Sequence, residues 1–307
     1  MQDEKRNSND FAFDADVTNS IAEETKKNNY KIDQVENIKI NDESIRGPLV
    51  IFFGPSNIGK TVSVLRLIKK ISAHYTITTN RDFRKDDKYP ETIKLFEKLL
   101  TENNYAPDAT GKINFILLDV TRTNDGPFCQ ILEAPGEHFF DSLNPTKKHP
   151  RYLVDIFNNI SYSKIYVFFF AVGMFEDQEI RKQYANNITT LISSKLDSKR
   201  DKVIILVNKC DEHPAKFKNG KPDENRFKND IYQQNSFGAV RDILQHSGFK
   251  RIHFVPFSAC EPYQFESDGE IKKVLASSAD YYPEKLWYSI YDCVKGKFPF
   301  SFRNIFG

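Results

Sequence analysis

The eight residues from Gly54 to Thr61, GPSNIGKT, constrain this chain more than any other part of its sequence. They follow the apolar run PLVIFF, which predicts a buried strand, and precede TVSVLRLIKKISAHY, whose apolar residues recur at helical spacing. The segment fits G-x-x-x-x-G-K-[ST] in the strand, loop and helix context that this pattern requires. Its glycines let backbone N–H groups wrap an anion, and the helix adds the positive end of its dipole. The sequence therefore predicts a phosphate-binding loop; the alternative is a chance glycine turn before a helix.

Strand-like and helix-like segments alternate along the rest of the chain. The apolar runs KIYVFFFAV, KVIILVN and IHFVPFS predict buried strands, and each precedes a segment with helical character. The runs INFILLDVT and PFCQILE flank the turn RTNDG and predict a hairpin. Buried strands that alternate with helices indicate a mostly parallel sheet. We therefore expect a doubly wound α/β domain with one antiparallel hairpin strand and with helices on both faces.

The chain divides into an arm, a main domain and a tail. Residues 1–46 carry 11 acidic and 7 basic residues and few periodic aliphatic residues, which predicts a disordered acidic arm. Residues 47–296 form the predicted α/β domain, with polar insertions expected near 81–109 and 212–236. Residues 297–307 form a Phe-rich tail, which we expect to pack back on the domain.

The overall composition argues against several classes of protein. The formal net charge is only +2, so no excess of charge indicates binding to nucleic acid or to an anionic membrane. The four cysteines are far apart and form no CxxC pair, which argues against a zinc site and favours reduced thiols. The N-terminus is charged and the apolar runs are only strand-sized. We therefore expect a cytoplasmic protein without a transmembrane segment.

A second motif, Asn208-Lys209-Cys210-Asp211, directly follows the predicted strand KVIILV. A carboxylate at Asp211 can accept hydrogen bonds from N1–H and the 2-amino group of guanine, a donor pair that adenine lacks. Lys209 would lie over the plane of the base, and Asn208 would brace the neighbouring loops. On its own, such a tetrapeptide is common in polar loops. The tetrapeptide becomes informative because other motifs stand before and after it in the chain.

Two further elements complete an ordered set. Glu133 to Gly136, EAPG, ends the second strand of the predicted hairpin, and Ser258-Ala259-Cys260 ends the strand IHFVPF. In order, the four elements resemble GxxxxGK[ST], DxxG, NKxD and SAK of the translation-factor and Ras-like class of P-loop GTPases. The resemblance covers roughly residues 48–296. Within that class, the segments APDAT and GEHFF resemble bacterial GTPase domains of the double-GTPase and conflict-system type.

The resemblance implies GTP or GDP as the ligand and Mg²⁺ as the cofactor. The loop threonine Thr61 would ligate the metal through its hydroxyl, with Glu133 nearby and Thr110 capping it from the first switch. Thr78 and Thr79 are rivals for the place of Thr110, and each of these threonines could instead be an ordinary loop hydroxyl. The expected nucleotide contacts are Gly54, Asn57, Ile58, Gly59, Lys60, Thr61, Val62, Gly136, Asn208, Lys209, Asp211, Ser258, Ala259 and Cys260.

The chain departs from the class pattern at three of these elements. Glu133 replaces the usual Asp, Glu137 replaces the Gln that positions the attacking water, and Cys260 replaces Lys. Lys60, Glu137 and Thr110 remain the expected catalytic residues. Because Glu137 brings negative charge towards the γ-phosphate, we expect slow hydrolysis. Asn57 could hold K⁺, as in GTPases with a GxxNxGK loop, although an asparagine here more often caps the loop.

The function expected from the sequence is that of a GTP-dependent switch. The protein would hydrolyse GTP slowly, and an effector or activating protein would respond to the change of nucleotide. One alternative is a scaffold that binds GTP with little or no hydrolysis. Another is a P-loop ATPase or kinase, which requires the NKCD segment to be accidental. The oligomeric state stays open.

Overall fold

The computed structural model describes residue 35 and residues 38–101, 115–123, 125–233, 235–258 and 280–296, with only the backbone of 261–267 and 270–276. From Ile38 onward, these residues belong to one compact unit. Most of the predicted arm and the whole of the predicted tail lie outside the described residues.

The last part of the predicted arm, residues 38–46, is ordered and packs on the domain. Ile40 forms an isolated antiparallel bridge with Arg84, and the N–H of Asn41 donates to the carbonyl of Phe83 at 2.9 Å. Ile45 is buried. A segment rich in charge can thus be held by a few backbone contacts and one apolar anchor.

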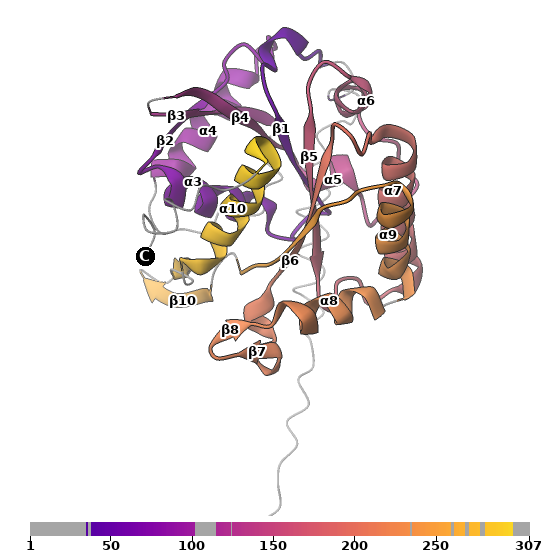
Figure 1. Ribbon diagram of the computed structural model, residues 1–307. Helices are drawn as coiled ribbons and strands as arrows, with labels where there is room; N and C mark the ends of the chain where they lie inside the picture. Colours follow the sequence, from indigo (N-terminus) through magenta and orange to yellow (C-terminus); the bar gives the residue numbers. More distant parts are fainter. Residues whose placement is uncertain are drawn as a thin grey trace, which may run out of the picture. The chain divides into compact units, whose positions relative to one another are not determined.

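A seven-stranded sheet forms the centre of the domain (Figure 1). In spatial order its strands are β2 (Tyr75–Thr79), β3 (Ile116–Arg122), β4 (Gly126–Glu133), β1 (Leu49–Phe53), β5 (Lys164–Ala171), β6 (Lys202–Asn208) and β9 (Ile252–Pro256). Neighbouring strands run parallel, except that β3 is antiparallel to both β2 and β4. The predicted mostly parallel sheet with one antiparallel hairpin strand is confirmed.

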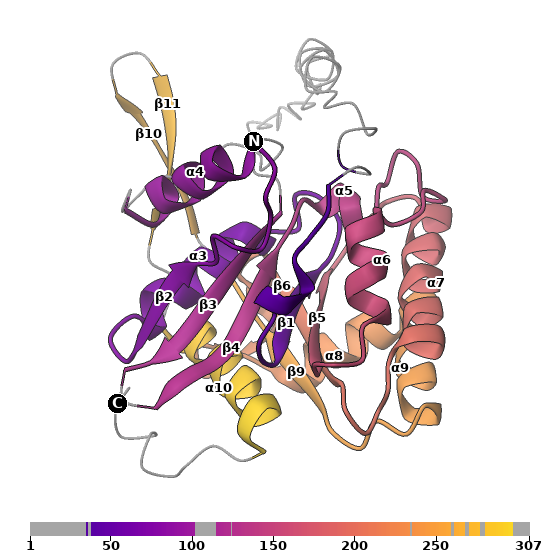
Figure 2. The ribbon, with the colours of Figure 1, turned by 90° about the horizontal axis from the view of Figure 1, so that it is seen from above.

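Helices cover both faces of this sheet (Figures 1 and 2). On one face, α3 (Lys60–Ile71) packs against α10 (Tyr281–Lys295). The other face carries α6 (Arg151–Asn158), α7 (Gln178–Lys195) and α9 (Asn235–His246). The arrangement is doubly wound, as predicted.

Shorter elements complete the described residues. They are the 3₁₀ turns η1 (Asp42–Ser44), η3 (Cys210–Glu212) and η4 (Pro214–Lys216), the helices α4 (Tyr89–Thr101), α5 (Gly136–Phe139) and α8 (Glu224–Gln233), and the hairpins β7 (Phe217–Lys218) with β8 (Lys221–Pro222) and β10 (Glu261–Ser267) with β11 (Glu270–Ala276). Of these, α4 lies in the predicted insertion 81–109, and η4, β7, β8 and α8 lie in the predicted insertion 212–236.

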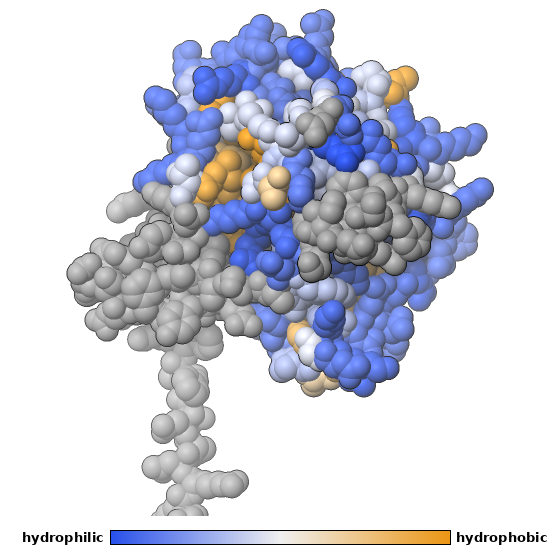
Figure 3. Space-filling view, turned by 60° about the vertical axis from the view of Figure 1, so that its left-hand side comes forward, coloured by the Kyte–Doolittle hydropathy of each residue, from blue (hydrophilic) through white to orange (hydrophobic). Residues whose placement is uncertain are grey.

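The amino-acid pattern of the central strands follows from this layering. All residues of β5 (KIYVFFFA) are buried, because a strand covered by helices on both faces needs apolar side chains on both sides. With the left-hand side of Figure 1 brought forward, the described surface is largely hydrophilic with a few separate apolar areas (Figure 3). In the part of the chain that is described, no helix has the length and apolar character needed to cross a membrane.

The carboxyl ends of the parallel strands bring together the loops that the sequence singles out. β1 ends just before Gly54, β4 ends at Glu133, and β6 ends at Asn208. β9 ends two residues before Ser258. In open α/β sheets, ligands bind outside this edge, so the fold directs attention there.

Candidate functional site

The loop from Gly54 to Gly59 turns sharply between β1 and α3. Gly59 has φ +88° and Asn57 has φ +60°, both in the left-handed region. Glycine adopts this region freely, and asparagine tolerates it better than most residues. A Cβ on Gly54 would lie only 2.8 Å from the Cβ of Phe169 on β5, so the start of the loop also needs glycine.

Lys60 is the first residue of α3, and its side chain is buried inside the loop that precedes it. Its Nζ donates to the carbonyl of Pro55 at 2.8 Å. Burial lowers the pKa of Lys60 to about 8, although the carboxylates of Glu133 and Glu137 favour the charged form. The loop thus curls around a buried ammonium group, the counter-charge that a phosphate would need.

Thr61 and Glu133 join the loop to the end of β4. The hydroxyl of Thr61 donates to Oε1 of the Glu133 carboxylate. Glu133 is buried, and burial raises the pKa of its carboxyl to about 7, opposed by Lys60 and by the bond from Thr61. Its other oxygen, Oε2, is buried and has no hydrogen-bond partner among the described residues. A buried carboxylate oxygen without a partner is costly unless something binds it.

The pair of Thr61 and Glu133 fits a magnesium ion that a nucleotide helps to hold. Hydroxyl and carboxylate oxygens are ligands that Mg²⁺ prefers, and the ion is usually bound by one or two carboxylates together with substrate phosphates. Glu133 is one methylene longer than Asp, yet its carboxylate still reaches the hydroxyl of Thr61. The extra length therefore does not separate the two groups.

Gly136, the first residue of α5, lies directly against the phosphate-loop backbone. A Cβ built on Gly136 would be 2.1 Å from the backbone nitrogen of Ser56 and 2.3 Å from the carbonyl carbon of Pro55. Gly136 does not have a positive φ, so the need for glycine is purely one of space. The EAPG segment and the phosphate loop therefore touch through their backbones.

Asn208, at the end of β6, connects a third loop to the first. Its Nδ2 donates to the carbonyl of Ile58 at 2.7 Å, and its Oδ1 is buried without a hydrogen-bond partner among the described residues. Lys209 follows with φ +59° and is exposed, with its Nζ 3.8 Å from Oε1 of Glu212. The backbone N–H of Cys210 donates to the carbonyl of Phe257 at 3.1 Å.

Asp211 receives a short hydrogen bond from the loop after β9. The hydroxyl of Ser258, which is fully buried, donates to Oδ1 of Asp211 at 2.5 Å. This bond fixes the orientation of a carboxylate that is itself only half-buried. The two neighbours of Ser258 in the predicted element, Ala259 and Cys260, lie outside the described residues, as does Thr110.

The other predicted residues differ in their exposure. Ile58 is buried, Val62 is half-buried, and Asn57 and Glu137 are exposed. The conformational preference of asparagine for φ +60° is enough to explain Asn57 without a bound K⁺ ion. Of the rivals of Thr110, Thr78 lies within β2, and the hydroxyl of Thr79 donates to Glu97 at 3.0 Å.

From the sequence, His138 could assist a water molecule but is more often a surface or partner-contact residue, and the group of side chains that it joins beside Gly136 was not predicted. His138 is largely enclosed, and its Nδ1 lies 2.8 Å from the hydroxyl of Tyr152 on α6. Burial lowers the pKa of His138 to about 3, helped by the positive charges of Lys147 and Lys60, so the ring is neutral at neutral pH. The ring of Tyr152 stacks on Phe115 at a centroid distance of 3.6 Å. The only sequence signal was the aromatic character of GEHFF and RYLVDIF.

The chain matches no protein-family model and no curated protein. Chains of solved structures do match, and one of them is from the crystal structure of Sup35 complexed with GMPPNP, with a TM-score of 0.30 and 12% sequence identity. The match covers 71% of this chain and 39% of that chain.

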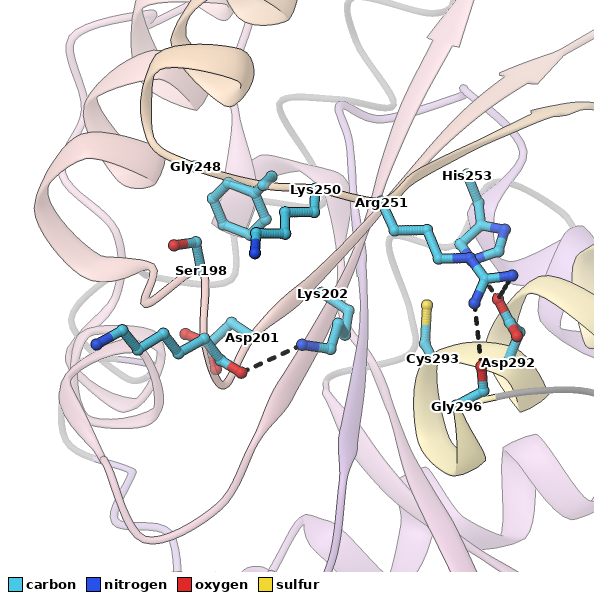
Figure 4. A pocket seen from close by; sticks show the side chains of 12 residues that line it. Ser198, Asp201, Lys202, Gly248, Lys250, Arg251, His253, Asp292, Cys293 and Gly296 are labelled. Carbon is cyan, nitrogen blue, oxygen red and sulfur yellow. Dashed lines mark hydrogen bonds and ion pairs between the residues drawn. The ribbon is translucent and has the colours of Figure 1, made fainter.

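A pocket of about 560 Å³ lies at the opposite edge of the sheet, by the starts of β6 and β9 and the carboxyl ends of α9 and α10 (Figure 4). Arg251 donates to the carbonyl of Gly296 at 3.0 Å and pairs with Asp292 at 2.9 Å. His253 also lies 2.9 Å from that carboxylate. Cationic side chains at the carboxyl ends of helices complement the helix dipole, which accounts for the positive groups here.

Proposed function

We propose that this chain binds GTP and GDP with Mg²⁺ at the carboxyl edge of its sheet, and that it is a slow GTPase acting as a nucleotide-dependent switch. It would belong to the translation-factor and Ras-like class, near the bacterial double-GTPase and conflict-system domains. The observation that carries this proposal is the direct contact between the predicted elements. Thr61 bonds to Glu133, and Asn208 bonds to the carbonyl of Ile58.

Each of these groups has a task in the proposed reaction, the in-line attack of water on the γ-phosphate. Lys60 and the N–H groups of the loop would hold the β- and γ-phosphates and stabilise the charge that develops on them. Thr61 and Glu133 would hold Mg²⁺, which neutralises the same charge when bound. Lys60 would exchange its bond to the carbonyl of Pro55 for bonds to phosphate oxygens.

Selection of guanine would depend on Asp211. Ser258 holds Oδ1 of its carboxylate, and a carboxylate oxygen can accept more than one hydrogen bond, so both oxygens stay available to N1–H and the 2-amino group. We expect Asp211→Asn to weaken GTP binding by about 100-fold, since an amide donor would face the guanine donors. Affinity for XTP should rise, because xanthine carries an oxygen at position 2. Competition titrations with a fluorescent GTP analogue measure both.

The matched control for Asp211→Asn is Glu212→Gln, which alters the neighbouring, more exposed carboxylate. That variant should keep the wild-type preference for GTP. If Asp211→Asn prefers GTP over XTP as strongly as the wild type does, Asp211 does not contact the base. ATP binding equal to GTP binding in the wild-type protein would favour the ATPase or kinase alternative.

Hydrolysis would depend on Glu137, an exposed carboxylate next to Gly136. It could position the attacking water, but its negative charge opposes the charge that develops on the γ-phosphate. We expect a slow single-turnover rate for the isolated protein and about a 10-fold lower rate for Glu137→Ala, with unchanged GTP affinity. Rapid-quench measurement of γ-phosphate release gives the rate, and Glu176→Ala, which also removes an exposed carboxylate, is the control.

The second candidate function is a GTP-dependent scaffold with little or no hydrolysis. One observation favours this function. The carboxylates of Glu133 and Glu137 both lie close enough to Lys60 to favour its charged form. If the wild type releases no phosphate with Mg²⁺ present, the scaffold replaces the switch that depends on turnover. If Glu137→Ala releases phosphate at the wild-type rate, that carboxylate is not catalytic.

The experiment that tests the whole proposal is a titration with GTP, GDP and ATP, each with and without Mg²⁺. We expect tight binding of both guanine nucleotides, weak binding of ATP, and a loss of GTP affinity when the metal is removed. If the protein binds none of the three nucleotides, the proposed function is refuted.

A further inference from the structure

A groove of about 380 Å³ lies between α6, α7 and the loop at 145–149. The loop and α6 come soon after α5 in the chain, and α5 carries Gly136 at its start. The groove is separate from the phosphate loop, and nothing in the proposed GTPase function uses it. Its size suits a few side chains of a bound segment.

The lining of this groove carries positive charge and no acidic side chain. Lys147, Lys148 and Lys195 all contribute to it. Lys147 lies 3.7 Å from Asp141, Lys195 donates to Asn158 at 2.7 Å, and Lys148 is exposed. The remaining polar groups are neutral amides, hydroxyls and the ring of His149. A bound group of negative charge would therefore be attracted to this groove and would meet no like charge on its walls.

The apolar part of this groove consists of Val154, which is exposed, and of Phe157 and Leu191, which are buried. Among the described residues, the exposed large hydrophobic side chains are Leu143 (85% exposed), Val154 (38%) and Ile160 (78%). All of them fall on α6 or on the segments next to it in the chain, and of these only Val154 lines the groove. Such a concentration on one segment marks an interaction surface better than scattered exposed residues would.

A chain of contacts joins the groove to the phosphate loop. Gly136 touches the backbone of Ser56, and Phe139 in the same short helix accepts a hydrogen bond from Nδ2 of Asn187 at 3.3 Å. Nδ1 of His149 lies 3.1 Å from the carbonyl of His138. Asn187 and His149 both line the groove. A displacement of α5 would therefore change the walls of the groove directly.

We infer that this groove binds an acidic, amphipathic peptide segment of a partner protein, and that the affinity depends on the bound nucleotide. The nucleotide dependence rests on the function proposed above, whereas the binding itself does not. Acidic side chains of the peptide pair with Lys148 and its lysine neighbours, and its apolar face packs on the exposed side chain of Val154. An amphipathic helix in a groove is a common form of peptide recognition, and a recessed site fits it better than a flat membrane surface.

The test uses the full chain and a fluorescein-labelled helical peptide with glutamates on one face and leucines on the other. Fluorescence anisotropy measures its affinity with GDP and with a non-hydrolysable GTP analogue in the presence of Mg²⁺. We expect binding that differs at least about 5-fold between the two nucleotides, a coupling of the usual size. Lys148→Glu should weaken it about 10-fold, because attraction becomes repulsion. Val154→Ser should weaken it through loss of apolar contact, and both positions are exposed enough to leave the fold intact.

The controls separate specific binding from general attraction. Lys94→Glu reverses an exposed charge on α4, away from the groove, and should leave the affinity unchanged. A peptide with lysines in place of its glutamates should not bind. The inference is overturned if Lys148→Glu and Lys94→Glu have equal effects, if the acidic peptide binds no better than the lysine peptide, or if phosphatidylserine vesicles bind equally well through Lys148.

Nucleotide titrations on the same samples distinguish this inference from the proposed function. If the protein binds no GTP or GDP but binds the peptide through Lys148, the proposed function fails and the groove remains a peptide site. If both nucleotides bind normally and the peptide does not, the groove assignment fails and the proposed function stands. Equal peptide affinity with the two nucleotides refutes the inferred coupling.

Discussion

Lys60→Ala is expected to abolish nucleotide binding while the fold remains intact. The Nζ of Lys60 is buried within the phosphate loop, 2.8 Å from the carbonyl of Pro55. Charge-assisted hydrogen bonds contribute about 1.5–3 kcal/mol each, so the loss of two such bonds to phosphates corresponds to at least about 100-fold in affinity. Titration with a fluorescent GTP analogue measures this loss.

The stability of the Lys60→Ala protein gives the necessary second measurement. Removal of a buried ammonium group also removes its desolvation cost, and Glu133 can take up a proton because its carboxyl pKa is already raised to about 7. We therefore expect thermal unfolding within a few degrees of the wild type. Lys69→Ala, on the exposed part of the same helix, should keep full nucleotide affinity. Wild-type affinity in Lys60→Ala would mean that the loop does not hold the phosphates.

The sequence predicts the elements whose pattern is local. The phosphate loop and α3 follow from a glycine motif between two periodic segments, and the hairpin of β3 and β4 follows from two β-type runs around a turn. The strand β2 was missed. The predicted helix continued through Tyr75, but α3 ends at Ile71, with no Gly or Pro to mark its end. Tyr75 instead packs against Phe128 and Trp287, contacts between distant parts of the chain that no local pattern contains.

The helix α6 was missed for a related reason. It has only eight residues and no acidic residue in its first turn, and helices this short are marginal without contacts from the rest of the fold. Its position depends on the stacking of Tyr152 on Phe115 and on the contact between Tyr152 and His138. These aromatic contacts join three separate segments of the chain, which periodicity cannot detect.

The candidate site shows the same division between local and distant information. The sequence motifs name Lys60, Thr61 and Asn208, because each belongs to a short pattern with a known geometry. The bond from Asn208 to Ile58 spans 150 residues, and its length and burial depend on how β1 and β6 lie in the sheet. The steric contact of Gly136 with Ser56 likewise comes from the folded chain alone.

Gly136→Ala is expected to have the second large effect, on hydrolysis. The added Cβ would lie 2.1 Å from the nitrogen of Ser56, far inside any allowed contact, and the neighbour is backbone that no rotamer change can move. Either the EAPG segment or the phosphate loop must therefore shift. A misplacement of about 1 Å at a reacting centre costs about 100-fold in rate, and we expect a single-turnover rate lower by about that factor. Overpacking should also destabilise the fold by about 1–3 kcal/mol.

The control for Gly136→Ala is Gly47→Ala, because a Cβ at Gly47 would meet nothing within 4 Å and its φ is not positive. That variant should match the wild type in stability, nucleotide binding and rate. The phosphate loop is held by the bonds from Asn208 to the carbonyl of Ile58 and from Lys60 to the carbonyl of Pro55, whereas the EAPG segment continues into the short helix α5, so the segment should be the part that moves. GDP affinity should then fall less than the hydrolysis rate. If Gly136→Ala leaves both the rate and the preference for GTP over GDP unchanged, Gly136 does not lie against the phosphate loop when nucleotide is bound, and it cannot transmit the state of the γ-phosphate to the groove between α6 and α7.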